Sequence, residues 1–237
     1  MRLALLLAPV LLLGACDKLD ATKMVRDTGP DITQTFPATG FNGVELRGPE
    51  SVTVKTGPAF SVTAKGPRRA VEGIDIQVQG GLLRVGRKEG RMSYSGRGAE
   101  ITVTMPAIAT ALISGPGSLD IDKVRGDSFA LALTGAGSAE VGEVAVRTAE
   151  MSITGAGSVE AAGSAQTTTL MLKGVGSFDL DKFTTRDLKV SLRGTGSIDV
   201  RATGTATGEA AGVGSVSVAG GAKCSIARRG MGSVECT

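Results

Sequence analysis

The stretch 131–160, LALTGAGSAEVGEVAVRTAEMSITGAGSVE, holds two copies of a Gly-x-Gly-Ser motif set 20 residues apart. Seven copies occur in the second half of the chain, and their successive starts lie 20, 20, 19, 20, 18 and 18 residues apart. Such a near-constant period predicts a solenoid, in which each repeat stacks on the one before it. The expected turn glycines are Gly115, Gly117, Gly135, Gly137, Gly155, Gly157, Gly174, Gly176, Gly194, Gly196, Gly212, Gly214, Gly230 and Gly232.

Apolar residues alternate with polar ones on both sides of each motif. In the copy that begins at Gly155, Met151 and Ile153 precede the turn, and Val159 and Ala161 follow it. This period of two predicts two strands per coil with these side chains inside, joined by the Gly-x-Gly turn. We expect glycine at the turn because it accepts positive φ without a Cβ clash. The predicted fold class is all-β: a parallel β-solenoid of about 18–20 residues per coil, with strands stacked about 4.8 Å apart.

The part of the chain before the motifs is less regular but has the same strand character. Six short alternating runs are bounded by Gly, Pro or charged residues, which favours strands. They are 44–46, 51–55, 60–64, 74–78, 82–85 and 100–105. We therefore expect one solenoid domain over 39–237, with irregular strands over 39–110, seven coils over 111–237, and no helix.

One outward row of the coils is acidic. Three residues after the second glycine of successive motifs come Asp120, Glu140, Glu160, Asp179 and Asp199. In a parallel solenoid these carboxylates would stack in one outer column beside a row of serines, and neighbours would repel by about 0.9 kcal/mol in water. The strip could attract divalent cations, polyamines or a basic partner, or it could be a solvated strand face with counter-charges such as Lys123 and Lys182. We expect the solvated face, because the nine-residue calcium repeat of other solenoids is absent.

The N-terminus carries an export signal. Arg2 is followed by an apolar run over 3–13 and then by Gly14-Ala15-Cys16. This run is too short to span a bilayer, so we expect a signal peptide over 1–15. Residues 13–16, Leu-Gly-Ala-Cys, resemble the bacterial lipobox, which implies lipidation of Cys16 and an anchor in the membrane. The alternative is an ordinary secretory signal. The polar residues 16–38 show no sustained period and are expected to form a tether.

Two further cysteines, Cys224 and Cys236, lie 12 residues apart around the last motif. Export to an oxidising compartment favours a disulfide between them. A metal pair is the alternative, although two thiols without histidine make a poor metal site.

The composition excludes several classes of function. The chain has 237 residues, no histidine, no tryptophan and one tyrosine, and its net charge of +3 comes from scattered basic residues. The lack of histidine removes the side chain most used for proton transfer and the commonest metal ligand. The balanced charge and scarce aromatic rings argue against nucleic acid as a partner. We expect no catalytic residues, no metal and no cofactor.

The order of these features resembles a known bacterial family. The motifs follow FNGVEL at 41–46, SVTVKTG at 51–57 and the strand end VTMP at 103–106. In this order they resemble DUF2807, also called the putative auto-transporter adhesin, head GIN domain family, from about residue 39 onward. The resemblance implies a right-handed β-solenoid similar in shape to pectin-lyase-like folds. It also implies roles at the cell surface or in adhesion, and no catalytic residues.

Two classes of function remain. The first is a non-enzymatic, lipid-anchored protein of the bacterial cell envelope, facing the periplasm or the outer surface, whose solenoid binds an unknown protein or glycan partner. The second is a polysaccharide-binding or polysaccharide-cleaving protein of pectin-lyase-like shape. We favour the first, because cleavage needs paired carboxylates, or a base with an arginine, gathered at one place. The acidic row instead repeats uniformly.

Replacing Cys16 by Ser should abolish incorporation of labelled acyl chains, because the thiol that would carry the lipid is removed. The protein should then be soluble or remain an uncleaved precursor, since stable anchoring depends on the acyl chains. The measurement is metabolic labelling with an alkyne fatty acid, followed by membrane fractionation. Cys224→Ser leaves the N-terminal motif intact and should label normally. Unchanged labelling of the Cys16→Ser protein would contradict the lipoprotein assignment.

Overall fold

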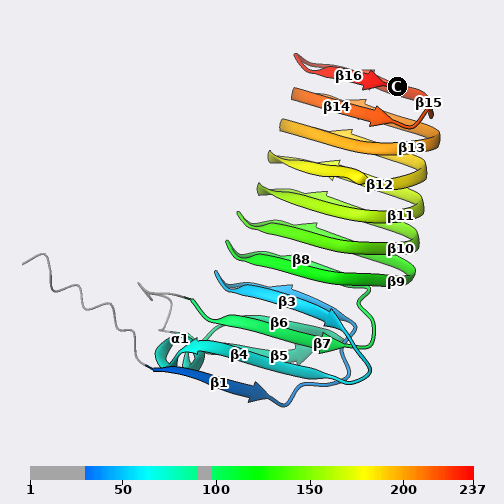
Figure 1. The fold of residues 1–237 in the computed structure, drawn as a ribbon. Helices are drawn as coiled ribbons and strands as arrows, with labels where there is room; N and C mark the ends of the chain where they lie inside the picture. The colour runs from blue at the N-terminus through cyan, green and yellow to red at the C-terminus, as the bar shows by residue number, and fades with distance from the viewer. Residues whose placement is uncertain (1–29, 90–97) are drawn as a thin grey trace, which may run out of the picture.

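The computed structural model describes residues 30–89 and 98–237 and is nearly all β, with 72% strand and 2% helix. The chain winds into a β-solenoid of about six turns, with the first strands in blue at one end and the last coil in red at the other (Figure 1). The predicted fold class is confirmed. The seven motifs mark corners, so they enclose six turns rather than seven. The signal peptide, Cys16 and residues 17–29 of the tether lie outside the described residues.

Each full coil is one long strand that curves around the solenoid, rather than two separate strands. The five full-length strands all begin within or just after one motif and end before the next. They are β9 (Ser118–Leu133), β10 (Ser138–Ile153), β11 (Ala156–Leu172), β12 (Val175–Leu192) and β13 (Thr195–Ala210). The stretch between the two predicted strands also pairs with the next coil, and it bends at irregularities such as the one between Glu160 and Gly163. Gly163 has a φ of 119° there. A bulge bends a strand while its ladder continues on both sides.

The end of the solenoid is split into shorter strands. These are β14 (Val213–Ala219), β15 (Lys223–Arg228) and β16 (Ser233–Cys236). β14 and β16 continue one face of the stack, and β15 pairs with the other half of β13. A disulfide joins Cys224 in β15 to Cys236 in β16, with Cα atoms 6.4 Å apart, and so links the two faces of the last coil.

The N-terminal strands extend both faces of the solenoid. One face continues from β9 through strands in the spatial order β3 (Ser51–Thr56), β7 (Glu100–Met105), β4 (Ser61–Pro67) and β1 (Asp31–Phe36). The other continues through β8 (Thr110–Ile113), β2 (Gly43–Leu46), β6 (Leu82–Arg87) and β5 (Ile74–Gln79). All six short strands predicted from the sequence are present.

Two elements differ from expectation. Residues 31–36 fall in the expected tether, but they form β1, which pairs antiparallel with β4. The folded part therefore begins near residue 31 rather than 39. The sequence signal for β1 is weak because this edge strand packs only Ile32 and Phe36 against the core. The second element is a five-residue helix, α1 (Arg68–Glu72), which buries Ala70 and Val71. Within residues 30–89 and 98–237, no helix is long and apolar enough to cross a membrane.

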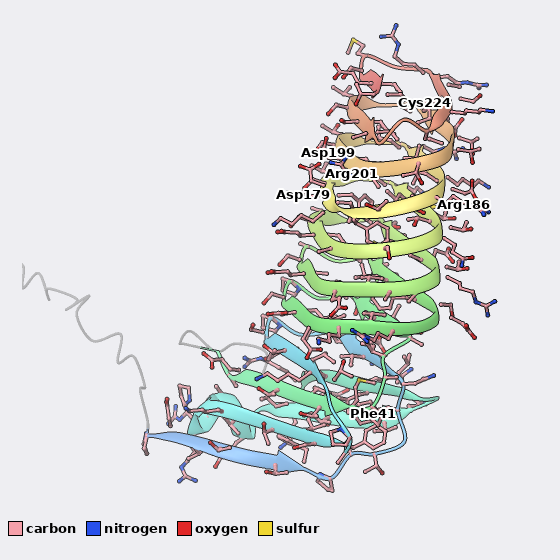
Figure 2. The ribbon with its side chains drawn as sticks, turned by 45° about the vertical axis from the view of Figure 1, so that its right-hand side comes forward. Phe41, Asp179, Arg186, Asp199, Arg201 and Cys224 are labelled. Carbon is pink, nitrogen blue, oxygen red and sulfur yellow. A yellow bond between two sulfur atoms is a disulfide. The ribbon has the colours of Figure 1, made fainter. Side chains whose placement is uncertain are left out.

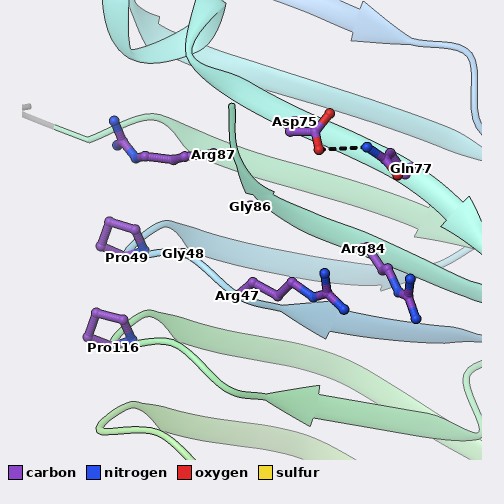
Figure 3. A pocket seen from close by; sticks show the side chains of 9 residues that line it. All are labelled: Arg47, Gly48, Pro49, Asp75, Gln77, Arg84, Gly86, Arg87 and Pro116. Atoms are coloured by element: carbon purple, nitrogen blue, oxygen red, sulfur yellow. Dashed lines mark hydrogen bonds between the residues drawn. The ribbon is translucent and has the colours of Figure 1, made fainter. Parts of the chain in front are cut away.

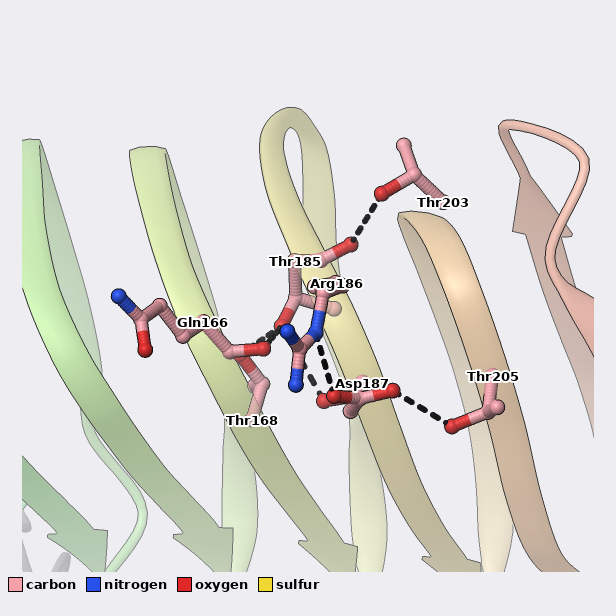
Figure 4. A network of polar contacts seen from close by, with 7 residues as sticks. All are labelled: Gln166, Thr168, Thr185, Arg186, Asp187, Thr203 and Thr205. Atoms are coloured by element: carbon pink, nitrogen blue, oxygen red, sulfur yellow. Dashed lines mark hydrogen bonds and ion pairs between the residues drawn. The ribbon is translucent and has the colours of Figure 1, made fainter.

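One hydrophobic core runs through the coils, because the register stacks equivalent residues. Val159, for example, pairs with Ala139 below and Phe178 above, and all three are at most 4% exposed. Two polar residues, Thr168 and Thr185, also point inward (Figure 4). The Thr168 hydroxyl lies 2.9 Å from that of Thr185, which in turn donates to a backbone carbonyl. Their polar groups are therefore satisfied inside the core.

The corners are hydrogen-bonded from coil to coil. The Ala156 amide donates to the Gly135 carbonyl at 3.0 Å, and the Val175 amide donates to the Gly155 carbonyl at 3.0 Å. This spacing leaves no room for side chains at the motif glycines. From Gly135 onward, a Cβ at any of them would lie closer than 3.0 Å to the carbonyl oxygen of the equivalent glycine in the preceding coil.

The expected reason for these glycines was wrong at most positions. Only Gly174, Gly196 and Gly214 among the fourteen have positive φ in the left-handed range. At the others, the backbone conformation would accept an L-residue. What excludes one is contact with the preceding coil, so the glycines are required by stacking rather than by turn geometry.

Replacing Gly157 by Ala should destabilise the fold by about 1–3 kcal/mol, because the new Cβ would press on the Gly137 carbonyl and displace a coil. The measurement is urea or thermal unfolding. Ala156→Val is the matched control, since position 156 is exposed and Val175 already occupies the equivalent place one coil later. Equal stability of the two variants would show that the glycine columns do not set the spacing of the coils.

Candidate functional site

The acidic residues form one continuous column on the outer surface. In register, Glu140 pairs with Asp120 and with Glu160, and Asp179 pairs with Glu160 and with Asp199. Figure 2 shows Asp179 and Asp199 one above the other on the same edge of the solenoid. The first four carboxylates are exposed and Asp199 is partly buried. We call these five residues the acidic ladder.

A row of serines runs beside the acidic ladder. Ser138 pairs with Ser118 and with Ser158, and the Ser118 hydroxyl donates to that of Ser51 at 3.1 Å. The serines and the first three carboxylates line a shallow groove of about 310 Å³. Because the register is unbroken, the groove offers the same pair of groups, a hydroxyl and a carboxylate, at each coil.

Cations lie near only part of the acidic ladder. Lys182 is 3.7 Å from Glu160, as expected for a counter-charge, whereas Lys123 lies 3.6 Å from Glu143, outside the ladder. Within the described part of the chain, no three His, Cys, Asp or Glu side chains gather closely enough to hold a metal ion. The carboxylates are therefore spread along a line rather than gathered around a point.

Asp199 is the partly buried member of the acidic ladder. Its partial burial raises the pKa of the carboxyl group, and the charges of Asp181 and Asp179 raise the pKa further. A hydrogen bond from Ser197 opposes the rise. The protonated form of Asp199 is thus favoured in the folded protein relative to the unfolded chain.

A basic groove lies on the other face of the later coils. Lys173, Lys189, Arg193 and Arg229 line it, with Glu209 as the acidic member, and its volume is about 690 Å³. The Arg193 guanidinium donates to Glu209 at 2.8 Å and holds the pKa of that carboxyl below its usual range. The two faces of the solenoid therefore differ in charge.

An eighth corner, which lacks the Gly-x-Gly-Ser motif, lies at the N-terminal end of the stack. Residues 48–51 are Gly-Pro-Glu-Ser, and Ser51 pairs with Ser118. The Ser118 amide donates to the Glu50 carbonyl at 3.1 Å, just as the Ser138 amide donates to the Gly117 carbonyl at 3.2 Å. Glu50 thus stands where every later corner has its second glycine. The shared pattern of an apolar residue, x, Gly-Pro, x, Ser at 46–51 and 113–118 could have revealed it.

Glu50 is the only fully buried carboxylate among the described residues. Its Oε1 accepts a hydrogen bond from the Arg87 Nε at 2.6 Å, and its side chain is 0% exposed against 8% for Arg87. Its Oε2 has no hydrogen-bond partner within the described residues. A buried charge of this kind is stabilised mainly by its partner, so Arg87 is needed to keep Glu50 in place.

Beside this corner lies a pocket of about 520 Å³ (Figure 3). Its lining comprises Arg47, Gly48, Pro49, Asp75, Gln77, Arg84, Gly86, Arg87 and Pro116. It lies where β5 and β6 meet the end of β2. We call it the arginine pocket. The sequence alone does not indicate this pocket, because its residues come from four separate segments, 47–49, 75–77, 84–87 and 116, that the fold brings together.

Comparison with known proteins places the chain among adhesin-like solenoids. A family model described as DUF2807: Putative auto-transporter adhesin, head GIN domain, matches residues 40–222. No curated protein matches the chain in sequence at a significant level.

Three solved structures are similar in fold. A putative adhesin from Bacteroides fragilis has a TM-score of 0.82 at 21% identity, covering 89% of this chain and 99% of that one. A putative adhesin from Parabacteroides merdae has a TM-score of 0.68 at 16% identity, covering 88% of this chain and 98% of that one. A putative lipid binding protein from Parabacteroides distasonis has a TM-score of 0.67 at 17% identity, covering 89% of this chain and 98% of that one. At these identities the likeness shows the fold alone.

Asp199→Asn should stabilise the protein at pH 7 by up to about 1 kcal/mol, because it removes a charge that is disfavoured by partial burial and by the carboxylates of Asp181 and Asp179. A carboxyl whose pKa is raised on folding binds more protons folded than unfolded, so its penalty is present above the folded pKa. The gain should therefore shrink as the pH falls toward 3.8, the ordinary value. Urea unfolding of both proteins at several pH values measures this gain in stability. Glu235→Gln is the control, since its column neighbour is Ser217, and a gain of equal size there would contradict the assignment.

Proposed function

The chain belongs to the DUF2807 family, putative auto-transporter adhesin, head GIN domain, and on this premise we propose that it is a non-enzymatic lipoprotein of the cell envelope that presents its solenoid surface for adhesion to a protein or glycan partner. The observation that carries the proposal is the unbroken register of the outer columns. Five carboxylates and their serine neighbours repeat from coil to coil with no local departure. Catalysis requires a local cluster, which these uniform columns do not provide, so the observation supports a non-enzymatic role.

The stacking of the coils supports a role as a rigid display surface. Corner and strand amides both bond to the neighbouring coil, and the apolar core is continuous. Side chains in one column therefore keep a fixed spacing along the axis. A rigid surface loses little entropy when a partner binds, which favours affinity.

The expected lipid at Cys16 would hold the solenoid near a membrane. Only 14 residues separate Cys16 from Asp31, where β1 begins. Fully extended, a segment of this length reaches at most about 50 Å. The family's adhesin-like character agrees with a location in the cell envelope or at the cell surface.

The second candidate function is binding or cleavage of polysaccharide. Cleavage needs two carboxylates in set positions about a bond, or a base beside an arginine. Glu50 and Arg87 are the nearest match, but the Glu50 side chain is 0% exposed and cannot reach a substrate. Binding without cleavage is favoured by the arginine pocket, which breaks the repeat and opens to solvent.

Bacteria that produce the full chain should adhere several-fold better to surfaces coated with envelope polysaccharide or envelope protein than bacteria that lack it. No new reducing ends should form when the purified protein is incubated with the polysaccharide. Cys16→Ser cells, in which the protein should lack the lipid anchor, are the control for anchoring. Equal adherence with and without the chain would overturn the adhesion proposal, and steady release of reducing ends would replace it with an enzymatic one.

The triple change Glu140→Gln, Glu160→Gln and Asp179→Asn tests whether the acidic ladder is the adhesive surface. We expect adherence to remain and stability to rise slightly, since repulsion is removed. Loss of adherence, or of calcium binding by the purified protein, with an intact fold would show that the ladder itself binds the partner. High salt should then reproduce the loss, because exposed charges are screened.

A further inference from the structure

We propose that the arginine pocket binds an acidic sugar residue, a uronic acid unit of an anionic glycan. The proposal rests on the proposed function, because it names the partner class that adhesion would use. It depends on four groups around one hollow: a guanidinium pair, an acceptor with an amide, an apolar wall and a glycine floor. The volume of about 520 Å³ lies within the range of small-ligand pockets and suits one or two sugar rings.

The guanidinium pair is built to receive a carboxylate. Arg47 and Arg84 both donate through Nε to one residue, Glu45, at 2.7 and 2.9 Å. Two cations thus share one anion, and the pair keeps a net positive charge. Within the described residues, the terminal amino groups of both guanidiniums make no hydrogen bond. Figure 3 shows them side by side at one end of the pocket. Arginine binds carboxylates through such paired N–H groups.

Hydroxyl recognition comes from the neighbouring strand. Gln77 donates to the Asp75 Oδ2 at 2.8 Å, which fixes an acceptor and an amide together at the pocket wall. Gln77 pairs with Arg84 and Asp75 pairs with Gly86, so Gln77 lies beside one arginine of the pair and Asp75 lies beside the glycine. A carboxylate and an amide placed together can accept from and donate to adjacent ring hydroxyls.

The hollow exists because Gly86 occupies the middle of the row. A Cβ added at Gly86 would have one contact, with the Arg47 Cβ at 3.5 Å, which is an ordinary distance. Glycine is therefore not needed there for packing, unlike at the corners. At the other end, Pro49 and Pro116 present exposed rings (Figure 3). They supply an apolar surface for the C–H face of a sugar.

Other ligands fit these groups less well. A neutral sugar leaves the terminal amino groups of the two guanidiniums without a charged partner. A phosphate or sulfate uses the arginines but has no ring hydroxyls for Asp75 and Gln77 and no apolar face for the prolines. A simple carboxylate uses the arginines but leaves Asp75, Gln77 and the prolines without contacts. A uronic acid unit, with one carboxylate, ring hydroxyls and an apolar face, uses all of them.

The test is calorimetric titration of the purified full chain with trigalacturonate, with its methyl ester and inorganic phosphate as the comparison ligands. We expect trigalacturonate to bind, and the ester to bind about tenfold to a hundredfold more weakly, as for loss of a charged hydrogen bond. Absence of binding by trigalacturonate would overturn the proposal. Equal or tighter binding of phosphate would also overturn it and assign a general anion site instead.

Three variants locate the binding. Arg47→Gln should weaken trigalacturonate about tenfold or more, while Arg84 still holds Glu45 and the fold persists. Gly86→Leu should abolish binding by filling the hollow, with unfolding unchanged. Arg147→Gln, an exposed arginine paired with Asp127 on a later coil, is the control and should bind as the unmodified protein does. Retention of affinity in both pocket variants would overturn the assignment.

The Asp75→Asn variant distinguishes binding of an acidic sugar from binding of a simple anion. Replacing the carboxylate by a neutral amide should weaken binding of trigalacturonate, because its hydroxyl then has only an uncharged acceptor. The same change should tighten binding of a simple anion by relieving repulsion. Tighter trigalacturonate binding would contradict the assignment of Asp75. The result is independent of the adherence of whole cells. If the pocket binds uronate but cells that produce the chain do not adhere, this inference stands and the adhesion proposal fails. If the cells adhere but the protein does not bind uronate, the adhesion proposal stands and this inference fails.

Discussion

The close approach of one peptide backbone to the next at the corners is the constraint on which the rest of the structure depends. Amide and carbonyl groups of successive corners are about 3 Å apart, and a Cβ at the motif glycines would meet a carbonyl oxygen of the preceding coil. This contact fixes the rise between coils. It also aligns each strand with its neighbour, because the ladder is pinned at every turn. The regular core and the outer columns are both consequences of that alignment.

Because the coils stack in register, a residue type that repeats in each coil forms a straight column on the surface. The acidic ladder arises because five coils repeat a carboxylate at the same place. At Asp199, partial burial and the neighbouring charges of Asp181 and Asp179 raise the pKa of the carboxyl group. The opposite face carries the basic groove. A chain with a small net charge thus has strongly polarised faces, which the overall composition does not show.

Much of this could be predicted from the sequence, since period and alternation are local signals. The coil length, the inward residues and the acidic ladder follow from spacing alone. Features that depend on distant contacts could not be predicted. β1 and α1 are short; β1 depends on antiparallel pairing with β4, and α1 packs against β4 and β1. The continuous curvature of each coil comes from bulges such as that at Gly163, which leave no clear period. The arginine pocket joins residues from β5, β6 and two corners, 47–49 and Pro116, so only the pairing of strands distant in sequence brings them together. The reason for the corner glycines also lay in a contact between coils, not in the conformation of each turn.

The corner at Glu50 has a consequence for how such a chain can change in length. Later corners are interchangeable, since each presents a bare backbone above and below, and duplication or loss of one period would leave two matching surfaces in contact. The Glu50 corner has a side chain folded over Gly48 and tied to Arg87. A further coil inserted beneath it would meet that side chain instead of a free carbonyl edge. Evolution can therefore add or remove coils on the C-terminal side of this residue, while the N-terminal end, with the pocket beside it, stays the same in short and long descendants.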